Sequence, residues 1–209
     1  MAPTPPPSAE LRAQFGDVDI YLCDQLLRGR FDARRRVLDA GCGNGRNLPY
    51  FLTRGYEVFA IDEDPASVGA VRALAGRLQP ALPIDVRQGA LHALPWADAR
   101  MDAVICSAVL HFARDRVHFE RMMDEIWRVL APGGIFFARL ASSIGIEPLV
   151  SETLGRVRLP DGSDRFVVDE QFLLDTTHDL RGRLLDPIKT TNVQNQRCMT
   201  TWVVQKRKT

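Results

Sequence analysis

The run Val37-Leu38-Asp39-Ala40-Gly41-Cys42-Gly43-Asn44-Gly45-Arg46-Asn47 decides the fold of this 209-residue chain. Residues 36–38 are predicted to form a short buried strand, three glycines follow at alternate positions, and residues 47–54 have the pattern of an amphipathic helix. Glycine lets the backbone bend sharply and carries no Cβ that would keep a ligand away. The first N–H groups of a helix have no partner within the helix and can hold a ligand. The run therefore predicts a cofactor-binding turn.

The spacing of these glycines separates two classes of cofactor. A dinucleotide-binding turn has the pattern G-x-G-x-x-G, in which the third glycine lets helix and strand pack closely. Arg46 stands at that position here, and its side chain would crowd the approach. An NAD-dependent oxidoreductase is therefore disfavoured. The pattern D-x-G-C-G-x-G instead resembles motif I of the class I S-adenosylmethionine-dependent methyltransferases.

Length and composition bound the class of protein. The 209 residues suit one domain, and the 45% apolar and 25% charged residues are ordinary for a globular chain. A net charge of +1 gives no field that would recruit nucleic acid or a membrane surface. The four cysteines are widely spaced, which argues against a zinc site or a disulfide framework. No signal peptide is recognised, and no apolar run approaches the about 20 residues of a membrane span. We expect a cytoplasmic protein with no metal.

Predicted strands and helices alternate after the glycine turn. Strands are expected at 57–61, 84–88, 101–106 and 135–140, and helices at 65–79, from Asp115 to Leu130 and at 169–180. The chain ends in two strands, 184–191 and 199–205. Alternating elements with short connections imply a parallel sheet with helices on both faces. The expected fold class is α/β, a Rossmann-like doubly wound, mostly parallel seven-stranded sheet with an antiparallel C-terminal hairpin strand.

Three segments lie outside this alternation. Residues 1–8 are proline-rich and are predicted to form a disordered tail ahead of a single domain over 9–209. Residues 9–31 have helical spacing, with Asp17 as the expected cap of the second part, and form an N-terminal helical cover. Residues 141–168 contain a predicted hairpin and are the candidate substrate lid, because loops of this size in compact domains are usually functional.

The resemblance to the methyltransferases implies a set of cofactor-binding residues. Ligands in open α/β sheets bind at the carboxyl ends of the strands. Asp62 ends the second strand and is implied to accept hydrogen bonds from both ribose hydroxyls, whereas Asp39 would favour the cationic amino-acid end of the cofactor. The implied set is Asp39, Gly41, Cys42, Gly43, Asn44, Gly45, Arg46, Asn47, Asp62, Glu63, Ala90, Leu91, Cys106 and Ser107.

One position departs from the family pattern. The segment after the third strand usually reads G-D-A-x-x-L-P-F, with an acid that contacts the adenine amino group, but this chain has Ala90 where the acid belongs. The adenine amine must then find another acceptor or water. The Leu91 N–H can still reach a ring nitrogen.

The reacting end of the cofactor is implied to point at residues 106–111, which resemble motif IV. His111 has the intrinsic pKa range of a general base, and Tyr21 in the N-terminal cover is a second candidate catalytic residue. A purely structural role is the alternative for both side chains. No motif specifies the acceptor atom.

We interpret the chain as a methyltransferase that uses S-adenosylmethionine, releases S-adenosylhomocysteine and acts on a small-molecule acceptor. It most resembles tellurite-resistance-type and general small-molecule methyltransferases. A protein or RNA methyltransferase is the first alternative, for which the five arginines between residues 28 and 36 are the argument. A non-catalytic S-adenosylmethionine-binding module is the second. We expect neither a membrane nor a nucleic acid as a partner.

Overall fold

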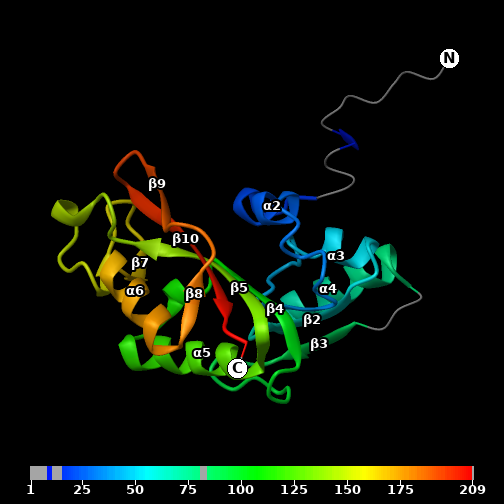
Figure 1. Cartoon of the computed structure of the whole chain (residues 1–209). Helices are drawn as coiled ribbons and strands as arrows, with labels where there is room; N and C mark the ends of the chain where they lie inside the picture. The colour runs from blue at the N-terminus through cyan, green and yellow to red at the C-terminus, as the bar shows by residue number, and fades with distance from the viewer. Residues whose placement is uncertain (1–8, 11–15, 81–83, 209) are drawn as a thin grey trace. The chain divides into compact units, whose positions relative to one another are not determined.

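The computed structural model describes residues 9–10, 16–80 and 84–208, so the tail predicted over 1–8 lies outside the described residues. The chain forms two compact units, residues 1–89 and 90–209. Figure 1 shows the helices and strands in chain order from blue to red. Within the described residues, no helix has both the length and the apolar character needed to cross a bilayer.

The first unit contains a parallel three-stranded sheet. Its strands are β1 (Arg36–Ala40), β2 (Glu57–Asp62) and β3 (Asp85–Gln88), and β2 pairs with the other two. Its helices are α2 (Ile20–Leu27), α3 (Pro49–Thr53) and α4 (Pro65–Leu78). Helix α4 begins where the sequence predicts, because Pro65 stands in its first turn and the Asp64 carboxylate accepts hydrogen bonds from the Ala66 and Ser67 N–H groups.

Helix α2 differs from the predicted cover. It is capped by Asp19, whose carboxylate accepts the Tyr21 N–H at 3.0 Å, so the prediction of Asp17 as the cap was wrong. Leu22 and Leu26 are buried as expected, but Ile20 and Leu27 are 73% and 77% exposed. Ile20 and Leu27 are seven residues apart, so they lie on one side of the helix, and that side is exposed.

The second unit contains strands that pair around β10. β4 (Met101–Ser107) runs parallel to β5 (Leu130–Ser142), and β10 (Arg197–Lys206) pairs antiparallel with β5. β8 (Gly182–Leu184) and β9 (Lys189–Val193) both pair antiparallel with β10. These pairings confirm the predicted α/β class with an antiparallel C-terminal strand.

Apart from a separate two-stranded hairpin, the described residues form eight strands, three in the first unit and five in the second. The sequence predicts seven. The additional strand arises because the single strand expected over 184–191 is divided into β8 and β9. Pro187 lies in the interruption, and proline has no N–H to give to a strand ladder. The remaining elements of the second unit are η1 (Leu110–Phe112), α5 (Arg116–Val129), η2 (Glu147–Leu149), β6 (Gly155–Arg158), β7 (Asp164–Val167) and α6 (Glu170–Asp179).

The segment predicted as a lid contains the expected hairpin, in which β6 and β7 pair antiparallel. The hairpin is not an open flap. Val157 and Val167 are buried in one apolar cluster with Ala141 and Cys198, which lie in β5 and β10. β7 also packs against η1. Residues 145–165 therefore contribute to the core, and the lid can be tested only by surface substitutions.

Helix α5 begins directly after Asp115, close to the predicted start, and the Asp115 carboxylate caps it by accepting the His118 N–H at 2.7 Å. Phe119, Met122, Met123 and Ile126 form its buried stripe. Val117 in the first turn of the helix is 56% exposed, and its spacing of five residues from Met122 suits a buried position poorly.

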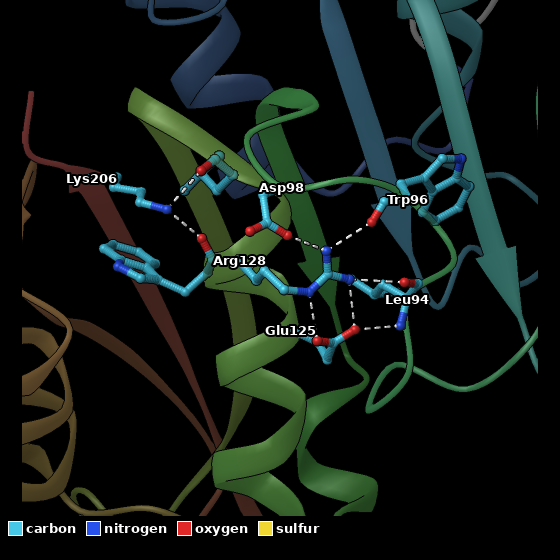
Figure 2. A network of polar contacts seen from close by, with 8 residues as sticks. Leu94, Trp96, Asp98, Glu125, Arg128 and Lys206 are labelled. Atoms are coloured by element: carbon cyan, nitrogen blue, oxygen red, sulfur yellow. Dashed lines mark hydrogen bonds and ion pairs between the residues drawn. The ribbon is translucent and has the colours of Figure 1, made fainter.

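Arg128 near the end of α5 binds residues 94–98, which follow Ala90 and Leu91 in the chain (Figure 2). Its guanidinium donates to the Leu94 and Trp96 carbonyl oxygens at 2.9 and 2.8 Å. It also pairs with Glu125 at 2.7 Å and with Asp98 at 2.8 Å. Glu125 in turn accepts the Leu94 N–H at 2.7 Å, and its pKa is lowered chiefly by the hydrogen bond from Arg128. Residues 94–98 are thus held by charge-assisted hydrogen bonds at both ends.

Candidate functional site

The three glycines after β1 all adopt positive φ angles, of 78°, 49° and 78° at Gly41, Gly43 and Gly45. Gly45 and Gly43 have different surroundings. A Cβ on Gly45 would lie 3.0 Å from the side chains of Val71 and Leu74, so glycine here lets the turn pack on α4. A Cβ on Gly43 would meet no protein atom within 4 Å. Gly43 is therefore the position at which the backbone is open to a ligand.

The helix after the turn begins later than predicted, at Pro49 instead of Asn47. The Gly45 N–H donates to the Cys42 carbonyl at 2.9 Å, and the Leu48 N–H donates to the Gly45 carbonyl at 3.0 Å. The expectation that free N–H groups of the new helix face the ligand stays a prediction. The turn is an irregular loop closed by its own hydrogen bonds.

Asp62 at the end of β2 supports this loop. Its carboxylate accepts the Gly43 N–H at 2.8 Å and the Asp64 N–H at 3.0 Å. The Gly41 and Cys42 N–H groups both donate to the Ile61 carbonyl, which ties the same loop to β2. A carboxylate offers about four lone-pair sites, so Asp62 can still accept hydrogen bonds from a ligand hydroxyl.

Asp39 is the most unusual group of the loop. It is 1% exposed, and within residues 9–10, 16–80 and 84–208 neither carboxylate oxygen has a hydrogen-bond partner. Burial raises its pKa to about 7; the charge of Arg46 opposes this shift, and that of Asp62 adds to it. A buried carboxylate without a partner is costly unless a cation or donor satisfies it. An ammonium group of a ligand would do so.

The other predicted members of the loop divide into supporting and exposed residues. Asn47 is buried, and its side-chain oxygen accepts the Asp19 N–H at 3.1 Å. Arg46 pairs with the Asp19 carboxylate at 3.3 Å. Cys42 is buried with its pKa raised to about 12, mainly by burial, so its thiol stays protonated. Asn44 and Glu63 are exposed. Asp19 thus joins α2 to the loop.

The second unit holds the remaining predicted residues. Ala90 is half-buried, and the Leu91 side chain is buried. Cys106 is fully buried in β4, and Ser107, which ends that strand, is also buried. Ala108 follows with φ of 65°, unusual for a residue other than glycine, and its N–H donates to the Arg139 carbonyl at 2.7 Å. This strained residue turns the chain from β4 into η1.

His111 lies in η1 and is 6% exposed. Its Nδ1 accepts the Ala141 N–H at 3.2 Å. Its pKa is lowered to about 4, first by burial and then by the positive charges of Arg165 and Arg197. The imidazole is therefore neutral at pH 7. Tyr21, the other candidate catalytic residue, is half-buried on α2 in the first unit. No group of three or more metal-binding side chains lies together among the described residues.

The first-unit residues fit the ligand that motif I implies. A buried carboxylate without a protein partner suits a cationic amino group, and a second carboxylate at the next strand end suits a diol. The open edge at Gly43 suits close approach. Sequence position identified these residues, but only the structure shows that Asp39 is unsatisfied.

Comparisons with known proteins agree with the sequence motifs. Residues 38–138 match a methyltransferase domain family. A relative from Mycolicibacterium smegmatis, named as a probable S-adenosylmethionine-dependent methyltransferase, is 35% identical over 116 residues, which are 56% of this chain and 42% of the relative. The ubiquinone biosynthesis O-methyltransferase of Methylocella silvestris is 36% identical over 122 residues, or 56% of this chain and 46% of that protein. This chain thus spans about half the length of these relatives.

Solved structures show the same fold. The 1,6-didemethyltoxoflavin-N1-methyltransferase of Burkholderia thailandensis, determined with 1,6-didemethyltoxoflavin and S-adenosylhomocysteine bound, has a TM-score of 0.69 and 20% identity to this chain. The match covers 99% of this chain and 93% of that one. This likeness confirms the predicted Rossmann-like methyltransferase fold.

Proposed function

We propose that this chain, which belongs to a methyltransferase domain family through residues 38–138, transfers a methyl group from S-adenosylmethionine to a small-molecule acceptor. One observation carries the proposal: the buried Asp39 carboxylate has no hydrogen-bond partner among the described residues and lies beside an open glycine turn that Asp62 supports. A structural aspartate would have a partner. A buried aspartate without a protein partner is expected in a site that binds the ammonium group of an amino acid.

The residues of the first unit bind and orient the cofactor. Asp39 pairs with its ammonium group, Asp62 accepts hydrogen bonds from its ribose hydroxyls, and Gly43 lets the backbone approach it. S-adenosylmethionine, when bound, supplies a methyl group already activated by a positively charged sulfur. The protein's contribution is then mainly to hold the reactants in line, and orientation of this kind can contribute about 7–11 kcal/mol.

Two observations support a small-molecule acceptor. The Burkholderia thailandensis protein is named for a small molecule, 1,6-didemethyltoxoflavin, and the Methylocella silvestris protein is named for ubiquinone biosynthesis. The net charge of +1 offers no general attraction to RNA. Five arginines between residues 28 and 36 were the argument for a protein or RNA acceptor. One of them, Arg28, forms an ion pair with Asp24 at 3.0 Å, which balances its charge. The tellurite-resistance subtype and the cytoplasmic location stay predictions.

Transfer of an isotopically labelled methyl group tests this proposal. The protein is incubated with methyl-labelled S-adenosylmethionine and a cell extract, and the extract is then separated into small molecules, protein and RNA. We expect S-adenosylhomocysteine to form and the label to enter the small-molecule fraction. The Gly43→Val variant, whose side chain fills the open edge of the turn, serves as the inactive control. Label in protein or RNA would support the alternative acceptors, and binding without any transfer would support a non-catalytic module.

A further inference from the structure

His111 is held in one protonation pattern by a contact from a distant strand. The Ala141 N–H in β5 donates to His111 Nδ1 at 3.2 Å, so Nδ1 acts as an acceptor and carries no proton. In a neutral imidazole the other ring nitrogen then carries the proton. Within the described part of the chain, no hydrogen bond satisfies Nε2. His111 therefore presents an N–H donor.

This geometry does not suit the general base that the sequence predicted. A base must accept a proton from the substrate on a free lone pair. The Nδ1 lone pair of His111 is directed at Ala141, and Nε2 already carries a proton. The burial of the ring and its two cationic neighbours both oppose a second proton. His111 can donate a hydrogen bond but is poorly placed to remove a proton.

Two positively charged side chains of the β6–β7 hairpin lie at the segment that carries His111. The Arg165 guanidinium on β7 lies 4.9 Å from the ring centre of Phe112, the residue after His111. Arg156 on β6 donates to the Ala113 carbonyl at 3.2 Å. Arg197 at the start of β10 also lowers the pKa of His111, but its guanidinium pairs with the Asp161 carboxylate at 3.6 Å, which offsets its charge. The hairpin thus brings cations to the segment that carries the His111 donor.

We propose that the Nε2–H of His111, with the positive charge of Arg165, recognises an anionic oxygen of the methyl acceptor. His111 is then a positioning residue for an acidic small molecule. This inference rests on the proposed function and narrows its substrate class. A carboxylate, a phosphate or an ionised hydroxyl would each match a neutral donor next to cationic side chains. An amine acceptor that carries a positive charge would be repelled.

The first test separates a donor from a base at His111. Glutamine can place an N–H near the position of Nε2, whereas alanine cannot, and neither side chain can act as a base. We expect labelling by His111→Gln to stay within about tenfold of wild type and labelling by His111→Ala to fall further, through a higher half-saturating extract concentration. An equal loss of at least about 100-fold in both variants, with the fold intact, would indicate a base.

Nitrogen NMR of the wild-type protein gives a readout that does not depend on activity. We expect the His111 signals of a neutral ring with the proton on Nε2 between pH 6 and pH 8. A proton on Nδ1, or a charged ring in this range, would overturn the proposal.

The second test determines whether the methyl acceptor is an anion or a cation. Portions of the extract are passed over an anion-exchange or a cation-exchange resin before the labelling reaction. We expect removal of anions to abolish labelling of small molecules and removal of cations to leave it unchanged. Labelling that survives anion removal would refute the anionic acceptor. No labelling in the untreated extract would instead refute the proposed function, so the two failures are distinguishable.

Surface substitutions on the hairpin complete the test. Arg165→Gln should raise the extract concentration that gives half-maximal labelling by about tenfold, whereas Arg165→Lys should recover most of the loss. Arg158→Gln is the matched control, because Arg158 lies on the same hairpin, is exposed and pairs with Asp164 at 2.9 Å. An equal effect of Arg158→Gln and Arg165→Gln would show that hairpin stability, not charge at His111, is responsible.

Discussion

Replacement of Asp39 by asparagine should stabilise the ligand-free protein. Burial raises the pKa of Asp39 to about 7, whereas an aspartate in an unfolded chain titrates near pH 3.9. Because the folded-state pKa is the higher one, the folded protein is favoured most below about pH 3.9, and this advantage is lost as the pH rises toward 7. The difference of about 3 pKa units corresponds to at most about 4 kcal/mol.

The net gain should be smaller than this limit. The asparagine amide remains a buried polar group, which costs about 1–3 kcal/mol when it is not hydrogen-bonded. We therefore expect Asp39→Asn to increase the free energy of unfolding by about 1–2 kcal/mol at pH 8. At pH 5 the folded wild type is already protonated at Asp39, so the variant should lose this advantage.

Urea unfolding at pH 5 and pH 8 measures this effect. Asp124→Asn, on the exposed face of α5, is the control and should change stability little at either pH. The stability of Asp39→Asn relative to wild type should rise by about 2 kcal/mol between the two pH values. A pH-independent difference, or a variant that is less stable than wild type at pH 8, would refute the view that Asp39 is a buried, unsatisfied carboxylate.

Three further changes test other parts of the account. Arg128→Met should lower the free energy of unfolding by about 2–3 kcal/mol in urea, because it removes charge-assisted hydrogen bonds to residues 94–98, whereas Arg121→Met on the exposed face of the same helix should cost little. Unchanged hydrogen exchange at the Leu94 N–H would contradict this. Gly43→Val should keep the fold by circular dichroism but weaken S-adenosylhomocysteine binding at least tenfold in calorimetry, and unchanged affinity would place the ligand elsewhere. Ala90→Asp should leave that affinity equal or tighter, because it restores an acceptor for the adenine amine; a large loss would show that the space is already filled.

The elements that the sequence predicted well depend on local signals. Strand β2 and helix α4 follow from residue periodicity. The helices predicted to start at Asp115 and Asp169 begin there because each aspartate caps N–H groups only three residues away. Asp39 and Asp62 were placed at strand ends by their position after apolar runs.

The features that the sequence did not predict depend on contacts between distant residues. The proton position on His111 is set by Ala141, thirty residues away, and the Arg128 contacts reach Leu94 and Trp96. The hairpin over β6 and β7 was predicted, but no local pattern reveals that Val157 packs into a core with residues of β5 and β10. Such contacts leave no periodic signal in the chain.

Calorimetric titration of S-adenosylhomocysteine tests the central claim most directly. We expect the wild-type protein to bind S-adenosylhomocysteine at pH 8 and NAD to neither bind nor compete. Asp62→Ala should weaken binding by about 1.5–3 kcal/mol, because it removes an acceptor of charge-assisted hydrogen bonds, and Asp62→Asn, which keeps one oxygen acceptor, should weaken it less. Absence of S-adenosylhomocysteine binding by the folded wild type, or competition by NAD, would contradict the account.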